Sequence, residues 1–291
     1  MPEFLLAVDG GGSGTRVIVA TPDGRVIGHG QAGPSALGQG VAKAWEQIAL
    51  SVQHAFFQAA VPMPAWERCA MAAGLSGVHN DAYCAAFKAV LPAFVRTLVV
   101  TDSHAMLIGA HAGQPGILVA AGTGSVGEAL YPDATHRVTG GWGFPVGDEG
   151  SGAWLGLKAV AHAQAAMDGR LEPGPLAHEV WQECGADRQT MAQWVAGAGQ
   201  HAYAQIAPCV WGCAHSDPVA NHLLDQAAAA LASMAVALDP AHSLPVVISG
   251  SIGERLTDRL PDDLKRRCVK AAMGPVEGAM CMLRENLGRT P

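Results

Sequence analysis

Charged and aromatic residues are scarce in this chain of 291 residues, at 15% and 5% of the total. Lys and Arg number 18 against 25 Asp and Glu, so the net charge is −7, and no basic run occurs. This balance argues against a general nucleic-acid-binding or anionic-membrane surface. It does not argue against a nucleotide, because phosphate sites rely on local backbone amides more than on net charge.

Targeting signals and paired cysteine motifs are also lacking. The first ten residues have no basic segment and carry Glu3 and Asp9, which is unlike a signal peptide. The longest nearly apolar stretch, Ala227–Leu238, is about half as long as a membrane span and contains Ser233. The seven cysteines are scattered and form no CxxC pair, which is typical of free thiols in a reducing cytosol. We therefore expect a cytoplasmic protein that binds no membrane.

Glycine, in contrast, is abundant. Its 36 residues are about 12% of the chain, against a usual share of about 7%. Hydrophobic residues make up 49%, enough for sizeable cores, so a disordered protein is excluded. The length suggests two domains or one large one. Many of the glycines gather in short clusters directly after apolar runs, and this placement indicates a common role.

The chain opens twice with the same pattern of strand, glycine turn, strand, Pro-Asp turn and strand. The first copy comprises Phe4–Val8, Asp9–Gly14, Thr15–Ala20, Thr21–Gly24 and Arg25–Gly30. The second comprises Ile117–Ala121, Gly122–Ser125, Gly127–Leu130, Tyr131–Ala134 and His136–Thr139. Gly10 and Gly122 are 112 positions apart, as are Val26 and Val138. The repetition predicts two related α/β domains that face each other across a cleft.

Hydrophobic periodicity and helix-breaking residues predict the remaining elements. Helices are expected over Val41–Ala60, Asp81–Leu91, Ser103–His111, Ala153–Met167, Pro175–Cys184, Thr190–Ala198, Pro218–Leu238 and Val276–Arg284. Strands are expected over Cys69–Gly74, Thr97–Thr101 and Pro245–Ser249, the last of which runs into the glycine cluster Gly250–Gly253. Together they indicate an α/β fold.

The glycine clusters suit phosphate binding, because a turn without Cβ atoms lets backbone amides approach phosphate oxygens closely. A P-loop requires Lys in GxxxxGK[ST], and the chain has no such sequence. Gly122–Gly127 matches GxGxxG after a strand, but a Rossmann site needs a helix to begin there. Here Glu128–Leu130 is expected to continue as a strand. The remaining pattern is a glycine hairpin, headed by an acidic residue and repeated in the second half.

This pattern resembles the phosphate loops of the actin/sugar-kinase/Hsp70 superfamily, with Asp9–Arg16 as the first loop, Gly122–Ser125 as the second and Ser249–Ser251 as the adenosine-side motif. Within it, the chain is most similar to the BadF/BadG/BcrA/BcrD-type ATPase family, in the branch of N-acetylglucosamine kinase and bacterial glucosamine kinase. The motifs that carry this resemblance occur in family order: Gly74–Gly77, Thr101–Asp102, Gly122–Ser125, Gly140–Gly143, Gly147–Ser151 and Val276–Ala279. The stretch from His215–Pro218 to Gly250–Gly253 also looks like glucosamine kinase.

The resemblance implies two actin-like (ribonuclease H-like) domains with a cleft between them. The N-terminal domain would comprise residues 1–115 and a C-terminal helix over 276–291, and the C-terminal domain residues 116–275. It also implies ATP-dependent phosphorylation of the C6 hydroxyl of N-acetylglucosamine or glucosamine, with ATP and Mg²⁺ as cofactors. Relatives are often dimers, so a homodimer stays open, although nothing in the pattern marks an interface.

The resemblance implies catalytic and nucleotide-binding roles for individual residues of this chain. Asp102 matches the base that accepts the sugar hydroxyl proton, and an N-cap of the following helix is the alternative. Asp9 matches the aspartate that holds Mg²⁺ through water, and a turn-initiating residue is the alternative. Contacts to the ATP phosphates are expected from Gly11, Gly12, Ser13, Thr15, Gly122, Thr123, Gly124 and Ser125, and adenosine-side contacts from Gly250 and Ser251.

Sugar contacts are expected from Ser76, Trp142, Gly143, Asp148 and Glu149. Trp142 suits stacking on one face of a pyranose, with a core tryptophan as the alternative. Glu149 either contacts the sugar or caps the helix that begins near Gly152. Two residues depart from the relatives, because Ala36 and Val126 stand where relatives have Asn. Two polar contacts are thus missing, which leaves the identity of the sugar open.

Two other functions fit the same superfamily. An ATP-hydrolysing activator of reductases or dehydratases needs cysteines that hold an iron–sulfur cluster, and Cys209 and Cys213 offer no convincing equivalent. A nucleotide-binding switch, as in transcriptional relatives, is not expected, because no helix-turn-helix segment precedes Phe4. A metal held by Cys209, Cys213 and His215 lacks a second ligand pair at a suitable spacing. The amino-sugar kinase is therefore the expected function.

Overall fold

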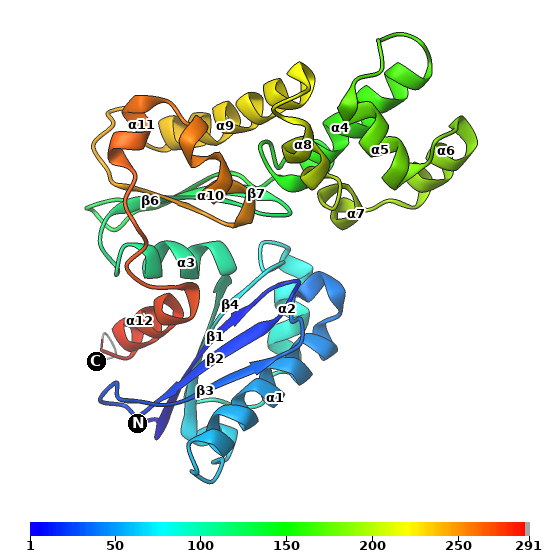
Figure 1. Ribbon diagram of the computed structural model, residues 1–291. Helices are drawn as coiled ribbons and strands as arrows, with labels where there is room; N and C mark the ends of the chain where they lie inside the picture. The colour runs from blue at the N-terminus through cyan, green and yellow to red at the C-terminus, as the bar shows by residue number, and fades with distance from the viewer. Residues whose placement is uncertain (289–291) are drawn as a thin grey trace. The chain divides into compact units, whose positions relative to one another are not determined.

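The chain packs into two compact units, each with its own sheet (Figure 1). The computed structural model describes residues 1–288, so the last three residues of the helix expected over 276–291 lie outside the described part. The first unit begins with Met1–Pro115 and resumes at Lys270, and the second is Gly116–Val269. Both units combine strands and helices, which confirms the predicted α/β class.

The sheet of the first unit has five strands in the order β3-β2-β1-β4-β5. They are β1 (Phe4–Gly10), β2 (Thr15–Ala20), β3 (Val26–Ala32), β4 (Cys69–Leu75) and β5 (Arg96–Thr101). β1 to β3 form an antiparallel meander, while β4 and β5 run parallel to β1. The helices are α1 (Val41–Gln58), α2 (Asp81–Val90), α3 (Asp102–Ala110) and α12 (Pro275–Gly288), with short 3₁₀ turns at Leu37–Gln39 and Trp66–Arg68.

Helices cover both faces of this sheet, which explains why β1 is a continuous apolar run. Leu6 and Val8 point into one core with Ile48 and Val52 of α1. Alternate strand residues, which face the other way, form a second core with α3 and α12. α3 and α12 approach closely, since a Cβ on Gly278 would lie 1.9 Å from the carbonyl oxygen of Ala105. A glycine is therefore required in the Val276–Ala279 motif for packing.

The sheet of the second unit repeats the arrangement with four strands in the order β8-β7-β6-β9. They are β6 (Gly116–Ala121), β7 (Ser125–Leu130), β8 (His136–Gly140) and β9 (Val246–Ser249). β6 to β8 form the meander, and β9 runs parallel to β6. Beyond β9, where the first unit has β5, Cys268 makes a single parallel bridge to Val246. The predicted duplicated opening is confirmed.

The helices of the second unit are α4 (Gly152–Met167), α5 (Pro175–Cys184), α6 (Arg188–Gly197), α7 (Gln200–Ala204), α8 (Ala207–Cys213), α9 (Pro218–Leu238), α10 (Ser251–Leu256) and α11 (Asp262–Arg267), with a 3₁₀ turn at Thr257–Arg259. Four of them, α7, α8, α10 and α11, were not predicted. They have five to seven residues, too few for a clear helical period. Alanines and leucines of α4 and α9 pack on Ile117 and Val119 to form the core.

The expected turn boundaries need correction. Gly10 still pairs with Thr15, and Ala121 with Ser125, so the strands extend further than expected. The first glycine turn is therefore residues 11–14 and the second glycine turn residues 122–124. The cluster Gly250–Gly253 is not a turn as a whole, because α10 begins at Ser251 directly after Gly250.

The His215–Pro218 stretch has a structural role through Asp217, whose side chain is 3% exposed. Its Oδ1 accepts from the amide of Val219 at 2.8 Å and caps α9. Its Oδ2 accepts from the amide of Leu176 at 2.9 Å, in the first turn of α5. One buried carboxylate thus satisfies the starts of two helices.

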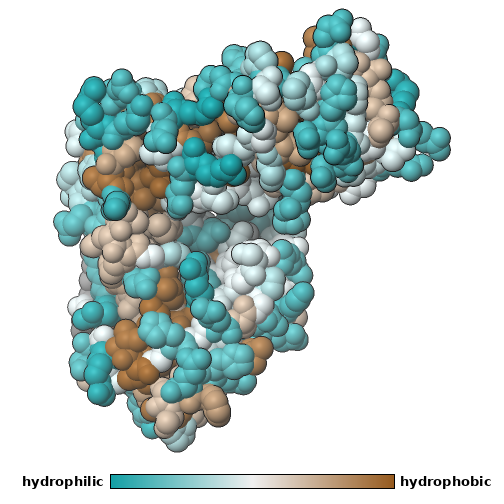
Figure 2. Space-filling view, in the orientation of Figure 1, coloured by the Kyte–Doolittle hydropathy of each residue, from teal (hydrophilic) through white to brown (hydrophobic). Residues whose placement is uncertain are grey.

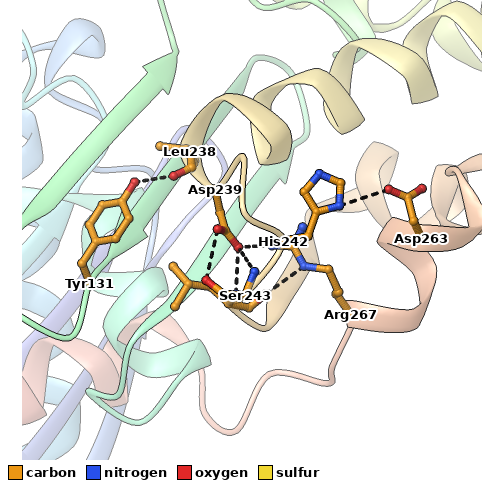
Figure 3. A network of polar contacts seen from close by, with 8 residues as sticks. Tyr131, Leu238, Asp239, His242, Ser243, Asp263 and Arg267 are labelled. Carbon is orange, nitrogen blue, oxygen red and sulfur yellow. Dashed lines mark hydrogen bonds and ion pairs between the residues drawn. The ribbon is translucent and has the colours of Figure 1, made fainter.

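A second buried carboxylate, Asp239, holds the connection from α9 to β9 (Figure 3). Its Oδ2 accepts from the amides of Ser243 and Leu244 at 2.7 and 2.8 Å and from Arg267 Nη2 at 2.6 Å. Burial alone would raise the pKa of Asp239, but these hydrogen bonds and the charge of Arg267 outweigh it, so the pKa lies below its ordinary value. The network anchors the segment from which β9 starts.

On the face in Figure 2, hydrophilic and neutral residues predominate and hydrophobic residues occur in separate groups. Among the described residues, none of the helices is both long enough and apolar enough to cross a bilayer.

Replacing Asp239 with Asn is expected to lower the free energy of unfolding by about 2–4 kcal/mol at neutral pH, because Arg267 loses its buried partner. Since folding lowers the pKa of Asp239, this stabilisation is present above about pH 4 and is lost as the pH falls through the folded-state value. Denaturant unfolding from neutral pH to about pH 3 measures both effects.

The matched control is Asp263→Asn, which removes the exposed partner of His242 in the same network. An exposed pair of this kind should contribute less than about 1 kcal/mol. Equal losses in the two variants, or a loss at Asp239 that does not depend on pH, would contradict the assignment.

Candidate functional site

Carbonyl groups in and directly before the first glycine turn accept hydrogen bonds from neighbouring loops. The carbonyl of Gly11 accepts from the amides of Ser35 and Ala36, both at 3.1 Å, and the carbonyl of Gly10 accepts from the amide of Ser76 at 2.9 Å. Within residues 1–288, the amides of Gly12 and Ser13 donate to no protein acceptor. Such a turn presents two adjacent amide donors, which suits an anion.

Carbonyl groups of the second glycine turn also accept hydrogen bonds, but from different partners. The carbonyls of Gly122 and Thr123 accept from the amides of Gly152 and Ala153 at 2.8 and 3.2 Å. These donors lie in the first turn of α4, where helix amides lack intrahelical partners. In the part of the chain that the structure describes, the amides of Thr123 and Gly124 have no protein acceptor. Each unit therefore carries one glycine turn that is a candidate anion-binding site.

Thr15 and Ser125, expected to contact phosphate, are buried at 2% and 4% exposure and bond to the protein. Thr15 Oγ1 lies 2.6 Å from the carbonyl oxygen of Gly33 and 2.7 Å from Ser35 Oγ. Ser125 Oγ donates to the carbonyl of Glu149 at 2.7 Å. Each is the first residue of the second strand of its unit, so both hydroxyls brace the loop beside a glycine turn.

The parallel strands bring the predicted residues of each unit to one sheet edge. In the first unit, Gly10 pairs with Leu75 and Leu75 with Thr101. The first glycine turn, Ser76 and Asp102 directly follow these three strand ends. In the second unit, Ala120 pairs with Ser249, so the second glycine turn and Gly250 share an edge. Ligands of α/β proteins bind at such carboxyl ends.

Asp102 begins α3 but does not cap it. The N-cap is Thr101, whose Oγ1 accepts from the amide of His104 at 3.1 Å. The interpretation of Asp102 as the N-cap is therefore wrong. Asp102 Oδ1 accepts from the amide of Ser103 at 3.0 Å, and the residue is half-buried. The carboxylate stands at the end of β5, where it can meet a ligand hydroxyl.

Asp9, the candidate metal ligand, pairs with Arg16, a residue not singled out from the sequence. Arg16 Nη2 and Nε donate to Asp9 Oδ2 at 2.8 and 3.1 Å. Burial raises the pKa of Asp9, Arg16 opposes this shift, and the charge of Glu277 adds to it. Because Arg16 bonds Oδ2, the other oxygen is available to a hydrated cation. A carboxylate oxygen of this kind fits Mg²⁺, which keeps most of its water ligands.

The loop between β8 and α4, residues 141–151, holds four of the five expected sugar contacts, and we call it the β8–α4 loop. Positive φ angles of 67° and 87° at Gly141 and Gly143 place Trp142 on the surface, with its side chain 86% exposed. The interpretation of Trp142 as a core residue is therefore wrong. Glu149 is not the cap of α4, because Ser151 accepts from the amide of Trp154 at 3.2 Å.

Asp148 is the buried centre of this loop, at 5% exposure and φ 61°. Burial raises the pKa of Asp148, while hydrogen bonds from the amides of Ser125 and Gly143 and from the Gln200 side chain oppose the shift. Its carboxylate also touches the second glycine turn, since a Cβ on Gly124 would lie 2.7 Å from Asp148 Oδ2. Only glycine fits at position 124 without displacing this carboxylate.

Other predicted residues lie beside these groups. Ser76 is fixed by two backbone bonds, because its carbonyl also accepts from the amide of Leu37 at 2.9 Å. Gly250 packs on Ala121, immediately before the second glycine turn. Val126, in place of the Asn of relatives, lies under Gly141.

Three partners of the predicted residues, Arg16, Ser35 and Gln200, carry no signal in the sequence that marks them as such. Cys209, Cys213 and His215 do not bring three ligand atoms together within the described residues. Burial raises the pKa of Cys209 to about 11, so its thiol is a poor source of thiolate.

Comparison with known proteins identifies the class. A structure from Chromobacterium violaceum, assigned as an N-acetylglucosamine kinase, is 44% identical and superposes with a TM-score of 0.91, covering 97% of this chain and 99% of its own. The ROK hexokinase of Thermus thermophilus, 16% identical, shares the fold with a TM-score of 0.57 over 98% and 99% of the two chains. The chain is thus an α/β protein with the two-part actin-like fold.

The family follows from the sequence as a whole. The chain belongs to the BadF/BadG/BcrA/BcrD ATPase family, which it matches over residues 6–280. Glucosamine kinase GspK of Vibrio cholerae is 28% identical over 279 residues, which cover 96% of this chain and 95% of that protein.

Replacing Gly124 with Ala is expected to lower the free energy of unfolding by about 1–3 kcal/mol, because the new methyl group overlaps Asp148. The control is Gly197→Ala at the end of α6, where a Cβ meets nothing within 4 Å and where alanine should not destabilise the helix. Denaturant unfolding of the wild type and both variants measures the difference. A Gly124→Ala protein as stable as the control would contradict the close contact.

Proposed function

We propose that this protein transfers the γ-phosphoryl group of ATP to the C6 hydroxyl of an amino sugar, glucosamine or N-acetylglucosamine. The observation that carries the proposal is the pair of glycine turns. In each turn at least one carbonyl accepts from amides of another segment, and two adjacent amides have no protein acceptor among the described residues. The whole-length relatives support it, because both are assigned to amino-sugar phosphorylation.

The phosphates of ATP bind to the two turns in this proposal. The amides of Gly12 and Ser13, and of Thr123 and Gly124, donate to phosphate oxygens, as backbone nests do in other phosphate sites. Gly11 and Gly122 shape the turns, and Thr15 and Ser125 hold them in place. Gly250 and Ser251 contact the adenosine side. Mg²⁺, held by Asp9 through water, neutralises phosphate charge when it is bound.

Asp102 acts as the base. Its carboxylate accepts the proton of the attacking C6 hydroxyl, whose oxygen bonds to the γ-phosphorus while the bond to the β-phosphate oxygen breaks. Because phosphoryl transfer passes through a loose transition state, the proton leaves late and an ordinary carboxylate suffices. The cap of α3 is Thr101 and not Asp102.

The sugar contacts the β8–α4 loop and Ser76. The exposed indole of Trp142 stacks on one face of the pyranose, while Asp148, with Gly143 and Glu149, contacts sugar hydroxyl groups. Ala36 and Val126 supply no polar group, so the choice between a free amine and an acetamide at C2 is left to experiment. A cytoplasmic location and a homodimer also stay predictions.

The iron–sulfur activator is not supported. The relatives that are 28% and 44% identical over nearly the whole chain are named as kinases of amino sugars. The thiols of Cys209 and Cys213 have pKa values raised by burial. A purified protein with a brown colour and bound iron would instead favour the activator.

A coupled assay of ADP release with glucosamine, N-acetylglucosamine, glucose and N-acetylmannosamine tests the proposal. We expect one of the two favoured amino sugars to stimulate ADP release most strongly, and its 6-deoxy analogue to give none, because the acceptor hydroxyl is absent. If none of the sugars stimulates ADP release above background, the kinase proposal is wrong.

Asp102→Asn should lower turnover by about 10²–10⁴-fold, because the proton of the C6 hydroxyl loses its acceptor. Binding of ATP, measured by calorimetry, should change little. Asp81→Asn is the matched control, since Asp81 is the first residue of α2 behind its own cap, Asn80. Near-normal turnover in Asp102→Asn, or an equal loss in Asp81→Asn, would rule out Asp102 as the base.

A further inference from the structure

The short helix α7 touches the β8–α4 loop at two points, although it follows that loop by about 50 positions. One contact is polar, through Gln200 at the start of α7, and the other is aromatic, through Tyr203 one turn later. Neither residue has a role in the proposed function so far. Both contacts lie within the second unit.

The polar contact joins the side-chain amide of Gln200 to the buried carboxylate of Asp148. Gln200 Nε2 donates to Asp148 Oδ2 at 2.7 Å. The same nitrogen would lie 3.1 Å from a Cβ on Gly124. The Gln200 amide therefore packs against both the sugar-contacting carboxylate and the second glycine turn.

The aromatic contact fixes the other end of the loop. The rings of Tyr203 and Phe144 have centroids 5.1 Å apart, and Trp194 of α6 stands edge-on to Tyr203 at the same separation. Tyr203 is 6% exposed. Its backbone packs directly on α4, since a Cβ on Gly156 would lie 1.8 Å from the Tyr203 carbonyl oxygen. α7 is thus held rigidly against the same helix that anchors the second glycine turn.

We propose that Gln200 is a positioning residue for sugar binding, which acts by holding the Asp148 carboxylate in the orientation that accepts the sugar. This inference rests on the proposed function, because it assumes that Asp148 contacts the sugar. Asp148 has four possible lone-pair directions, and Gln200 occupies one of them beside the backbone amides of Ser125 and Gly143. Without Gln200, the carboxylate loses its one side-chain hydrogen bond among those that shift its pKa.

The charge environment gives the sign of the expected pH effect. Burial raises the pKa of Asp148, and the charge of Glu149, the titratable group that acts on it among the described residues, raises it further. The Gln200 amide lowers the pKa of Asp148 by bonding to the ionised form. Removing this amide should therefore raise the pKa of Asp148. As the pH is lowered, the variant should lose sugar binding at a higher pH than the wild type does.

The test compares Gln200→Met, which keeps the length of the side chain and removes its amide, with Gln205→Met. Gln205 is the C-cap of the same helix and is exposed, and its Nε2 lies 3.4 Å from Nε2 of His201. For Gln200→Met we expect a rise in the KM for the sugar of roughly tenfold or more, because the lost bond is to a charged group. The KM for ATP should change less than about twofold, and the acid limb of kcat/KM should move to higher pH. Gln205→Met should match the wild type in all three.

A second measurement does not depend on turnover. In ¹³C NMR titrations of aspartate-labelled protein, the Asp148 carboxyl signal, assigned by its loss in Asp148→Asn, should titrate at a higher pH in Gln200→Met than in the wild type. An unchanged titration together with an unchanged KM for the sugar would overturn the proposal. So would equal rises in the KM for the sugar and for ATP, which indicate a general structural defect.

The experiments distinguish an error in the proposed kinase function from an error in the positioning role of Gln200. If the wild type phosphorylates none of the sugars, the proposed function is wrong, whatever the variant does. If the wild type is active and Gln200→Met equals Gln205→Met, the positioning role is wrong and the kinase proposal stands. Gln200→Glu provides a further check, since a second carboxylate at 2.7 Å should raise the KM for the sugar more than Gln200→Met does.

Discussion

The proposed chemistry depends on one constraint, which is that in both glycine turns the carbonyl group directly before the candidate phosphate-binding amides is hydrogen-bonded to another segment of the protein. A turn in water presents donors and acceptors alike, and its carbonyls would repel a polyphosphate. Here Gly11 and Gly122 give their carbonyls to amides from other segments. The two units reach this result differently, with a loop at Ser35–Ala36 in one and the first turn of α4 in the other. In both units a carbonyl of the turn is hydrogen-bonded, although the partners differ.

Buried carboxylates organise the second unit around its turn. Asp217 joins the starts of two helices, Asp239 fixes the entry to β9, and Asp148 connects the β8–α4 loop to the second glycine turn. Each sits where backbone amides lack regular partners, so the cost of burying a charge is offset by several hydrogen bonds. Whereas the pKa of Asp239 lies below its ordinary value, burial raises the pKa of Asp148. It is the least well satisfied of the three, which suits a group that gains a further partner from a ligand.

Much of the fold could be predicted from the sequence, because the central strands β1, β4 and β6 are buried on both faces and show as apolar runs that lead into glycine. The duplicated opening was also visible by pattern alone, with Gly10 and Gly122 112 positions apart. The structure, and not the pattern, gives Thr15 and Ser125 the same place as first residues of β2 and β7. Their hydroxyl partners could not be predicted, because Gly33 and Glu149 come near only after the loops fold. The contact of Gln200 with Asp148 spans 52 positions, and α7 is too short to reveal itself by periodicity. The sequence pattern thus predicts where the glycine turns lie, but the hydrogen-bond partners of the residues beside them depend on how the chain packs.

Because the chain returns to its first unit with α12, this unit is completed only late in synthesis. α3, which presents Asp102, packs on α12, yet α3 ends at Ala110 and α12 begins at Pro275, 275 − 110 = 165 positions later. The segment Gly116–Val269 can leave the ribosome and close its own core before α12 exists. During that interval, Ala105 and its apolar neighbours on the sheet lack the cover that α12 supplies. The nascent chain thus exposes a hydrophobic face beside Asp102 until α12 has been translated.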